Sequence, residues 1–360
     1  MNANTSRLHA VGQSLWLDGF TREMLANGDL SRCIAEWSVT GVSSDPTTFE
    51  HALCNGKAYD EAIAELARRE APAGDLLLVL ALQDLSAAAD MLRPVFDATD
   101  GREGWGSLPV SPLLAYNGAR TIHSAAWLHE AGERENLFVK IPGTTTGIEA
   151  IEESIFAGIP IDATLLFSRE HYVAAAEAYL RGIERRIAAD LDPNVASVAS
   201  FFVSPWDVAV KEEISPPFHN RLGVTMAMRT YKAFHDLLAS QRWRRLAQAG
   251  ARPQRLVWAD IGIKDSALPK AFYAEALAAP DTISAMPHDA LQAIADHGEA
   301  ITVLPADGGY ADAVLEEFRR EGVDDEALAA RLQREAVDVF AASWHALMHC
   351  VSERTAQFAA

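Results

Sequence analysis

A lysine lies at the end of an apolar run in the segment ENLFVKIPGTTTG, residues 135–147. The letters NLFVKI are typical of a largely buried β-strand, because most of these side chains suit a pleated, packed surface. A charged ammonium group is costly in such surroundings unless it is paired or neutral. The chain has only six lysines against 25 arginines, so a buried Lys140 invites a chemical explanation.

Two explanations of Lys140 are open at this point. An apolar cavity favours the neutral amine, which is the form that attacks carbonyl carbons and begins Schiff-base catalysis. Alternatively, Lys140 is structural and forms a buried ion pair with an acid such as Asp162. The first explanation requires a cavity beside the lysine, and that depends on the elements that carry it.

Composition and charge restrict the class of protein. A content of 49% hydrophobic residues is ordinary for a globular chain. The formal net charge of −19 argues against nucleic acid and anionic membrane surfaces as partners, although a few local arginines can still hold a small anion. The first residues lack the apolar core of a secretory signal, and the aliphatic run at 76–82 is too short for a bilayer. Three widely separated cysteines complete the expectation of a cytoplasmic protein.

Short strand-like runs alternate with longer helical patterns along the whole chain. Eight strands, each followed by a helix, predict a (β/α)8 TIM barrel. A doubly wound open sheet is the alternative, but it usually has fewer strands, and no GxGxxG or Walker motif follows any strand here. The predicted strands are 14–18, 38–44, 105–111, 136–141, 158–167, 195–204, 255–263 and 281–287.

We expect one domain over residues 1–360, with 307–358 as additional C-terminal helices. These helices pack on the barrel or on a partner in a homo-oligomer. Asp45 and Pro46 are suited to begin a helix after the second strand. The other predicted helical segments are around 20–36 and at 58–97, 145–157, 169–188, 220–248 and 288–297.

In a barrel of this kind, side chains at the carboxyl ends of the strands line the active site. Lys140 lies at that end of the fourth strand. Its predicted neighbours in the cavity are the polar residues that end the other strands, namely Asp18, Ser43, Ser44, Asp45, Asp162, Thr164, Ser200 and Asp260.

Several blocks of the sequence resemble the transaldolase family, particularly its longer bacterial form. They occur in the family's order and cover most of residues 12–345. The resemblance implies an α/β barrel, a class I Schiff-base mechanism on a small-molecule carbonyl substrate, and no metal or other cofactor. The blocks are SLWLDGFTREML, SVTGVSSDPTTFEHAL, DMLRPVFDATDGREGW, NLFVKIPGTTTGIEAIEESIFAGI, VASVASFFVS, ARPQRLVWADIGIKD and PDTISAMPHDALQAIADHG.

The resemblance also implies roles for individual residues. The Schiff-base lysine of the family's KIP motif falls on Lys140. The aspartate that acts as acid and base on the sugar hydroxyl falls on Asp18. The threonine and serine near the Schiff base and its water fall on Thr164 and Ser200. Lys140 is therefore predicted to form an imine.

The third strand departs from the family pattern. Its usual VSLEVSP reads GSLPVSP here, so Pro109 takes the place of a glutamate that works with the catalytic water. Proline can neither shuttle a proton nor donate a ladder hydrogen bond. General acid–base help is worth about 10²–10⁴-fold, so the ordinary reaction is impaired unless another group substitutes.

Two new acids stand where the family has asparagines near the substrate hydroxyls. They are Asp45, in SSDPT instead of TTNPT, and Asp162, in DAT instead of N-x-T. Two gained acids and one lost acid indicate a rearranged site. Asp162 or Asp45 is our candidate for the missing acid/base.

The predicted phosphate end differs as well. Pro205 replaces a phosphate-binding arginine, and Asp260 replaces a serine that contacts phosphate. An aspartate repels phosphate, and Lys264 offsets only part of this. The eighth strand reads SAMP in place of NTMP, at Ser284. The predicted substrate contacts are Ser44, Thr164, Ser200, Asp260, Lys264 and Ser284.

Three functions are compatible with these residues. The first is a Schiff-base enzyme that makes or breaks a C–C bond on an unphosphorylated substrate, one that can carry a cationic or amino group. The second is an ordinary transaldolase that moves dihydroxyacetone between sugar phosphates. The third is a non-catalytic descendant that binds a ligand or a protein partner. Retention of Asp18 and Lys140 favours the first.

Overall fold

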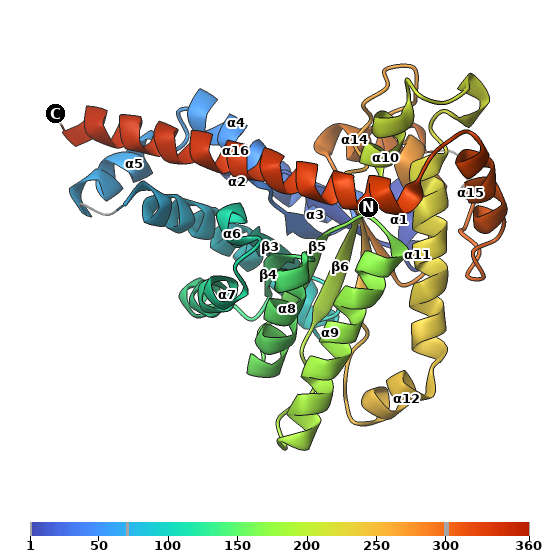
Figure 1. Cartoon of the computed structure of the whole chain (residues 1–360). Helices are drawn as coiled ribbons and strands as arrows, with labels where there is room; N and C mark the ends of the chain where they lie inside the picture. Colours follow the sequence, from blue (N-terminus) through green and yellow to red (C-terminus); the bar gives the residue numbers. More distant parts are fainter. Residues whose placement is uncertain (1, 70–71, 299–301, 360) are drawn as a thin grey trace.

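Eight parallel strands form the closed barrel of the computed structural model, which describes residues 2–69, 72–298 and 302–359 (Figure 1). Each strand pairs with its neighbour in the sequence, and β8 closes the ring against β1. The predicted (β/α)8 fold is confirmed, and each predicted strand overlaps an observed one. The strands are β1 (Ser14–Asp18), β2 (Val39–Ser43), β3 (Trp105–Pro109), β4 (Leu137–Pro142), β5 (Ile161–Leu166), β6 (Ser197–Phe202), β7 (Arg255–Ala259) and β8 (Thr282–Met286).

Helices surround the barrel and cover its outer face (Figure 1). Three short 3-10 turns, at Ala67–Arg69, Pro112–Leu114 and Pro216–Phe218, accompany them. The helices are α1 (Ala3–Ala10), α2 (Arg22–Ala26), α3 (Asp29–Trp37), α4 (Pro46–Asn55), α5 (Asp60–Leu66), α6 (Ala73–Ala98), α7 (Gly118–Gly132), α8 (Thr145–Ala157), α9 (Arg169–Ala188), α10 (Ser204–Val210), α11 (Leu222–Ala239), α12 (Gln241–Gln248), α13 (Phe272–Ala276), α14 (His288–His297), α15 (Ala311–Arg320) and α16 (Asp325–Ala359).

Three predicted helical segments are interrupted in the structure. The segment around 20–36 divides into α2 and α3 at Gly28, which adopts a φ of 84° that favours glycine. Segment 220–248 divides into α11 and α12 at Ser240, whose extended backbone and side chain cap the second helix. Segment 58–97 divides into α5, a 3-10 turn and α6, and residues 70–71 lie outside the described part of the chain.

Aromatic rings fill the middle of the barrel. Side chains alternate between the two faces of each strand, so Trp16, Trp105 and Phe138 all point inward. The ring centroids of Trp105 and Phe138 are 4.1 Å apart, and those of Trp16 and Phe138 are 6.1 Å apart. Gly41 leaves room for this layer, because a Cβ there would overlap the Trp16 indole. The layer is an apolar floor below the polar strand ends.

The long helix α16 crosses the mouth of the barrel (Figure 1). Its later turns pack with α4, α5 and α6 in a second hydrophobic cluster that includes Phe49, Tyr59, Trp344 and Leu347. Its earlier turns lie over the strand ends. Among the described helices, none combines the length and the apolar character needed to cross a membrane.

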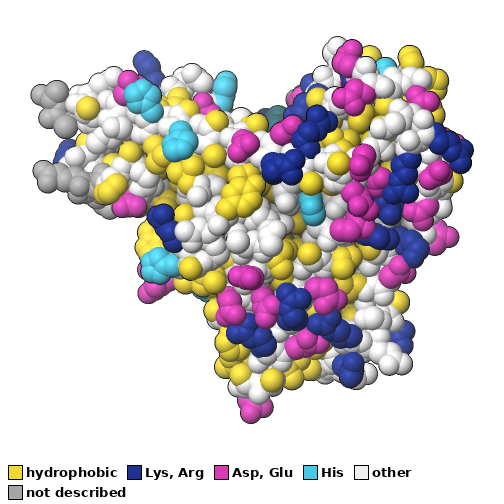
Figure 2. Space-filling view, in the orientation of Figure 1, with side chains coloured by type: hydrophobic (Ala, Val, Ile, Leu, Met, Phe, Trp, Pro, Cys, Tyr) yellow, Lys and Arg dark blue, Asp and Glu magenta, His cyan; other side chains and the backbone are white. Residues whose placement is uncertain are grey.

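Acidic and basic side chains are interleaved on the face shown in Figure 2, below its centre, where α8 and α9 lie. Ion pairs there join Arg181 to Glu152 at 2.6 Å and Arg185 to Glu153 at 2.6 Å. These pairs are partly exposed, so each contributes only about 0–1 kcal/mol to stability.

Candidate active site

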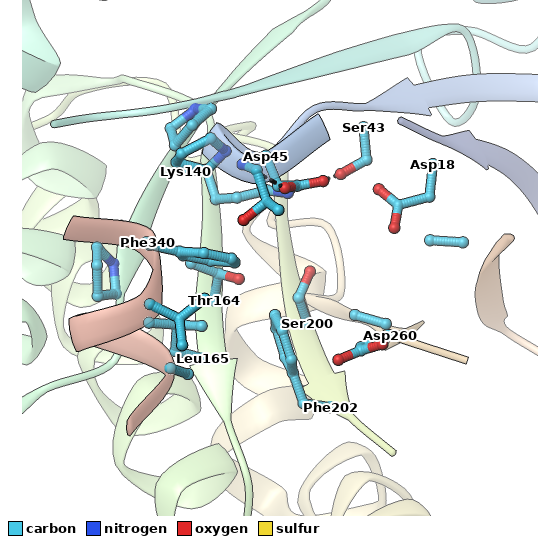
Figure 3. Close-up of a pocket in the computed structure, with 18 of the residues that line it drawn as sticks. Asp18, Ser43, Asp45, Lys140, Thr164, Leu165, Ser200, Phe202, Asp260 and Phe340 are labelled. Atoms are coloured by element: carbon cyan, nitrogen blue, oxygen red, sulfur yellow. Dashed lines mark hydrogen bonds between the residues drawn. The ribbon is translucent and has the colours of Figure 1, made fainter. Parts of the chain in front are cut away.

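A cavity of about 510 Å³ opens at the carboxyl ends of the strands, and every strand contributes to its lining. Its volume suits a small-molecule ligand. Figure 3 shows Lys140, Asp18, Asp45 and Asp260 arranged around it, with Phe340 of α16 forming part of one wall. The structure therefore brings together the polar residues that the sequence places at strand ends.

Lys140 is 7% exposed and points into this cavity from β4. Its Nζ donates a hydrogen bond to Ser43 Oγ at 2.6 Å and another to the Ser44 carbonyl at 3.2 Å. The carboxylate of Asp162 lies 3.8 Å away. Both explanations of the lysine thus retain support, because Lys140 has an acidic neighbour and also faces an open cavity.

Asp162 is held in place beside the lysine. It is 1% exposed, and its two oxygens accept hydrogen bonds of 2.7 Å from Ser107 Oγ and Ser200 Oγ. The two hydroxyl groups fix the position of both carboxylate oxygens. This geometry suits Asp162 as a fixed neighbour of Lys140.

Asp18 differs from Asp162 in its surroundings. Burial raises the pKa of its carboxyl to about 7, and the negative charges of Asp45 and Asp260 act in the same direction. Lys140 and a hydrogen bond with Ser43 oppose this increase. A carboxyl group with a pKa near 7 can both accept and donate a proton at neutral pH.

Ser43 connects Lys140 with Asp18. Its hydroxyl accepts the hydrogen bond from Lys140 Nζ, and its interaction with the Asp18 side chain lowers the pKa of that carboxyl. The three side chains come from β4, β2 and β1. One hydroxyl group therefore lies between the lysine and Asp18 (Figure 3).

Asp45 caps α4, as the sequence predicts. One carboxylate oxygen accepts from the backbone N–H groups of Thr47 and Thr48 at 2.8 and 3.0 Å, and the other accepts from Thr48 Oγ1 at 2.8 Å. Asp45 also lines the cavity. Because both oxygens accept hydrogen bonds, the carboxylate of Asp45 is held in place at the N-terminus of α4.

Asp260 and Lys264 lie together at the predicted phosphate end. Lys264 Nζ is 3.3 Å from Asp260 Oδ1, and Ser204 Oγ donates to the same oxygen at 3.2 Å. Pro205 also lines this side of the cavity. Among the described residues, the lining includes no arginine.

Thr164 and Ser200 both line the cavity, but Ser284 does not. Thr164 Oγ1 is buried without a hydrogen-bond partner, whereas Ser200 is bonded to Asp162. On β8 the residue facing the cavity is Ala285, so Ser284 points to the opposite face of the strand and is 0% exposed. Ser284 therefore does not line the cavity, and its predicted contact with the substrate has no support from this geometry.

Pro109 lies directly beside Lys140. The two residues are paired across β3 and β4, and Pro109 lines the cavity. Its ring places no acid or base where the resemblance implies a glutamate.

Two features of the site were not predicted from the sequence. The first is Ser107, which does not line the cavity but donates to Asp162; it lies two positions before Pro109 on the same strand face, and that alternation was a usable signal. Helix α16 contributes Leu332 and Phe340 to the wall. Gln333 fixes this helix by donating to the carbonyls of Gly143 and Leu165 at 3.1 and 2.9 Å. No local pattern connects α16 with the strand ends.

Metal ligands were not expected here. In the described ranges, no group of three or more His, Cys, Asp or Glu side chains is arranged to hold a metal ion.

A closed (β/α)8 barrel whose fourth strand presents a buried lysine to a cavity at the strand ends is the architecture of an aldolase-type enzyme. The sequence profile described as "Transaldolase/Fructose-6-phosphate aldolase" matches residues 15–351. The chain therefore belongs to the transaldolase/fructose-6-phosphate aldolase family.

Full-length relatives support the same family. A protein named "Transaldolase" from Thermobifida fusca (strain YX) is 39% identical over 366 residues, which cover 99% of each chain. "Transaldolase 1" of Streptomyces avermitilis is 38% identical and the match covers 97% of this chain and 95% of that protein. "Transaldolase" of Parafrankia sp. (strain EAN1pec) is 38% identical over 98% of both. The predicted family and enzyme class are confirmed, and the roles of single residues stay predictions.

Proposed function

We propose that this enzyme forms an imine between Lys140 and a ketone and then makes or breaks the adjacent C–C bond. The observation that carries the proposal is the contact of Lys140 Nζ with Ser43 and Asp162 at the mouth of the barrel. The amine attacks the carbonyl carbon, and the oxygen leaves as water with two protons that were on the ammonium nitrogen. The remaining iminium is the electron sink for the next step.

Asp18 is the acid/base of C–C cleavage in this proposal. Its carboxylate takes the proton of the hydroxyl group β to the iminium carbon, the C–C electron pair moves to nitrogen, and an aldehyde leaves. The resulting enamine attacks an acceptor aldehyde or takes up a proton, and water then hydrolyses the iminium. A pKa of about 7 for Asp18 supports both directions of proton transfer.

Asp18 and Ser43 also replace the glutamate that Pro109 displaces. In this proposal the Ser43 hydroxyl, which accepts the hydrogen bond from Lys140 and interacts with Asp18, relays a proton from the ammonium to Asp18, and the neutral amine then attacks the ketone. The carboxylate of Asp162, 3.8 Å from the lysine nitrogen and held by two hydroxyl groups, acts in this proposal as the counter-ion of the iminium. The two acids thus take different roles because their surroundings differ.

The substrate of this proposal lacks a phosphate group. The charged partner on the predicted phosphate side is Lys264, whose ammonium lies against the Asp260 carboxylate. Pro205 offers no hydrogen-bond donor where the resemblance implies an arginine. A phosphate dianion here would meet the negative charge of Asp260 before any unshared cation.

An ordinary transaldolase is the second candidate. The 39% identity to a full-length protein named "Transaldolase" favours it. A sugar phosphate would then have to displace Asp260 from Lys264 or bind at another part of the cavity.

Reductive trapping with borohydride tests the proposal and separates the candidates. Dihydroxyacetone, fructose and fructose 6-phosphate are compared, and the adduct is located by peptide mapping. We expect labelling at Lys140 by the unphosphorylated ketones in preference to the phosphate ester. Lys140→Ala removes the adduct, whereas Lys264→Met, which removes the other cavity lysine, retains it.

The alternatives predict different labelling. Dominant labelling by fructose 6-phosphate would establish the ordinary transaldolase. A protein that binds all three compounds but forms no adduct with any of them would be a non-catalytic descendant.

A further inference from the structure

We propose that the substrate carries a cationic nitrogen, which binds beside Asp260 at the end remote from the reacting carbonyl. This inference rests on the proposed function, because the carbonyl is placed at Lys140. It assigns a charge to a substrate for which the proposed function requires only the absence of phosphate.

The cavity has an excess of negative charge. Five carboxylates and two ammonium groups line it, and Arg331, outside the lining, is paired with Glu335 at 3.9 Å, which leaves two negative charges without a cation when all are ionised. One ammonium belongs to Lys140, which keeps a single positive charge when it becomes an iminium. The other belongs to Lys264, whose side chain is 55% exposed and therefore largely hydrated. The acids are Asp18, Asp45, Asp162, Asp260 and Glu335.

The acids near β1 and β7 repel one another. The charges of Asp45 and Asp260 both raise the pKa of Asp18. A cation placed beside Asp260 relieves this repulsion, and an anion increases it. The resting cavity is thus prepared electrostatically for a positive group.

The walls of the cavity also suit an organic cation. Phe202 and Phe340 present aromatic rings to the cavity, and Leu165 adds apolar surface (Figure 3). Pro205 lines the cavity as well. Aromatic faces attract ammonium groups and their alkyl substituents.

A separate observation points to a ligand in the same cavity. Thr164 Oγ1 is buried, 3% exposed as a residue, and has no hydrogen-bond partner. A buried hydroxyl without a partner is costly, so a polar group of a bound molecule is expected to satisfy it. The hydroxyls of Ser107 and Ser200 are already bonded to Asp162 and are not available in this way.

Two ketones of matched shape test the charge. One is a linear methyl ketone that ends in a trimethylammonium group, and the other ends in the isosteric, neutral tert-butyl group. Calorimetry measures the dissociation constant of each, and reductive trapping at Lys140 measures imine formation separately. We expect the cationic ketone to bind about tenfold more tightly at low ionic strength, with a smaller difference at high salt.

Two variants with opposite expected effects locate the cation site. Asp260→Asn removes the negative charge and keeps a residue type that tolerates the φ of 46° at this position. It should reduce the preference for the cationic ketone, whereas Lys264→Met, which frees Asp260, should increase it. Each change is expected to be about three- to tenfold.

The outcomes separate this inference from the proposed function. Equal or weaker binding of the cationic ketone overturns the inference, and trapping at Lys140 still supports imine chemistry. A cation preference that Asp260→Asn leaves unchanged overturns the assignment to Asp260. Absence of any trapped adduct, with the cation preference intact, rejects the proposed catalysis and leaves a site that binds cations.

Discussion

Lys140 and Asp162 are directly paired across β4 and β5, and their charged atoms lie 3.8 Å apart. Pro109 is paired with Lys140 on the other side, so the lysine stands between an aspartate and a proline. The resemblance implies an asparagine and a glutamate in these two positions. The negative charge has therefore moved from one neighbouring strand to the other.

Substitutions of Asp162 and Pro109, the two neighbours of Lys140, test whether one negative charge beside the lysine is needed. Asp162→Asn keeps the hydrogen-bonding shape but removes the charge, and should slow adduct formation at Lys140 on the order of 100-fold. Adding Pro109→Glu to this variant should recover at least part of the rate. Single-turnover trapping measures the rate in the native protein, in each single variant and in the double variant, which together form a double-mutant cycle. Additive losses in the double variant would argue against a shared role.

Removal of the Ser43 hydroxyl should interrupt proton transfer between Lys140 and Asp18. We expect Ser43→Ala to slow imine formation by about 10- to 100-fold. Ser43→Thr retains the hydroxyl and should stay within a few-fold of the native rate. The pH dependence of trapping provides the measurement. Equal rates in all three proteins would exclude the relay.

Asp18 makes the stability depend on pH. Folding raises its pKa from 3.8 to about 7, so the folded state binds this proton more tightly than the unfolded state. The favourable contribution of the protonated Asp18 carboxyl to the free energy of unfolding is complete below pH 3.8 and is lost as the pH rises through 7. Asp18→Asn should therefore increase the free energy of unfolding at pH 8 by on the order of 2 kcal/mol and have little effect near pH 4. Denaturant titrations at both pH values measure the difference.

Asp45 has two effects that substitutions can separate. Asp45→Asn preserves the cap of α4, since asparagine is also a good N-cap, but removes a charge that raises the pKa of Asp18. The rising limb of activity with pH should then move to lower pH, with stability nearly unchanged. Asp45→Ala should show the same displacement and lose about 1 kcal/mol of stability. A limb that does not move would show that Asp18 does not determine it.

Gln333 should anchor the wall that α16 provides. Gln333→Leu removes two hydrogen bonds to the carbonyls of Gly143 and Leu165. Leu165 has a φ of 57°, a conformation that leucine rarely adopts. We expect this variant to lose about 1–2 kcal/mol of the free energy of unfolding and to have a higher KM. The exposed Arg334→Met on the same helix is the control and should change neither quantity.

The sequence predicted the barrel well because its strands are short apolar runs that repeat regularly between helices. Lys140 and Asp162 were found for the same reason, since each is a charged residue within such a run. Ser284 was misplaced because a substitution relative to family pattern does not reveal which face of a strand a residue occupies. Alternation with Ala285 decides that, and it places Ser284 against the helices.

The chemical difference between the acids could not be predicted from sequence. Asp18 and Asp162 are both aspartates of barrel strands, and their surroundings differ because Asp162 accepts hydrogen bonds from two hydroxyl groups. The partners Ser107 and Ser200 come from other strands. The wall that α16 provides could not be predicted either, because Gln333 lies 168 positions from its partner Leu165 in the chain.

The docking of α16 also has consequences for the folding of the enzyme. Thr47 Oγ1 and Ser343 Oγ, 3.2 Å apart, are separated by 296 positions, so one wall of the cavity depends on a contact between distant parts of the chain. Contacts of such high sequence separation are slow to form, although the entropy cost grows only with the logarithm of the loop length. The barrel can therefore complete its hydrogen-bonded ring before the cavity is closed. Under mild denaturation the same helix can detach as a local unit, and activity would then disappear while the circular dichroism of the barrel persists.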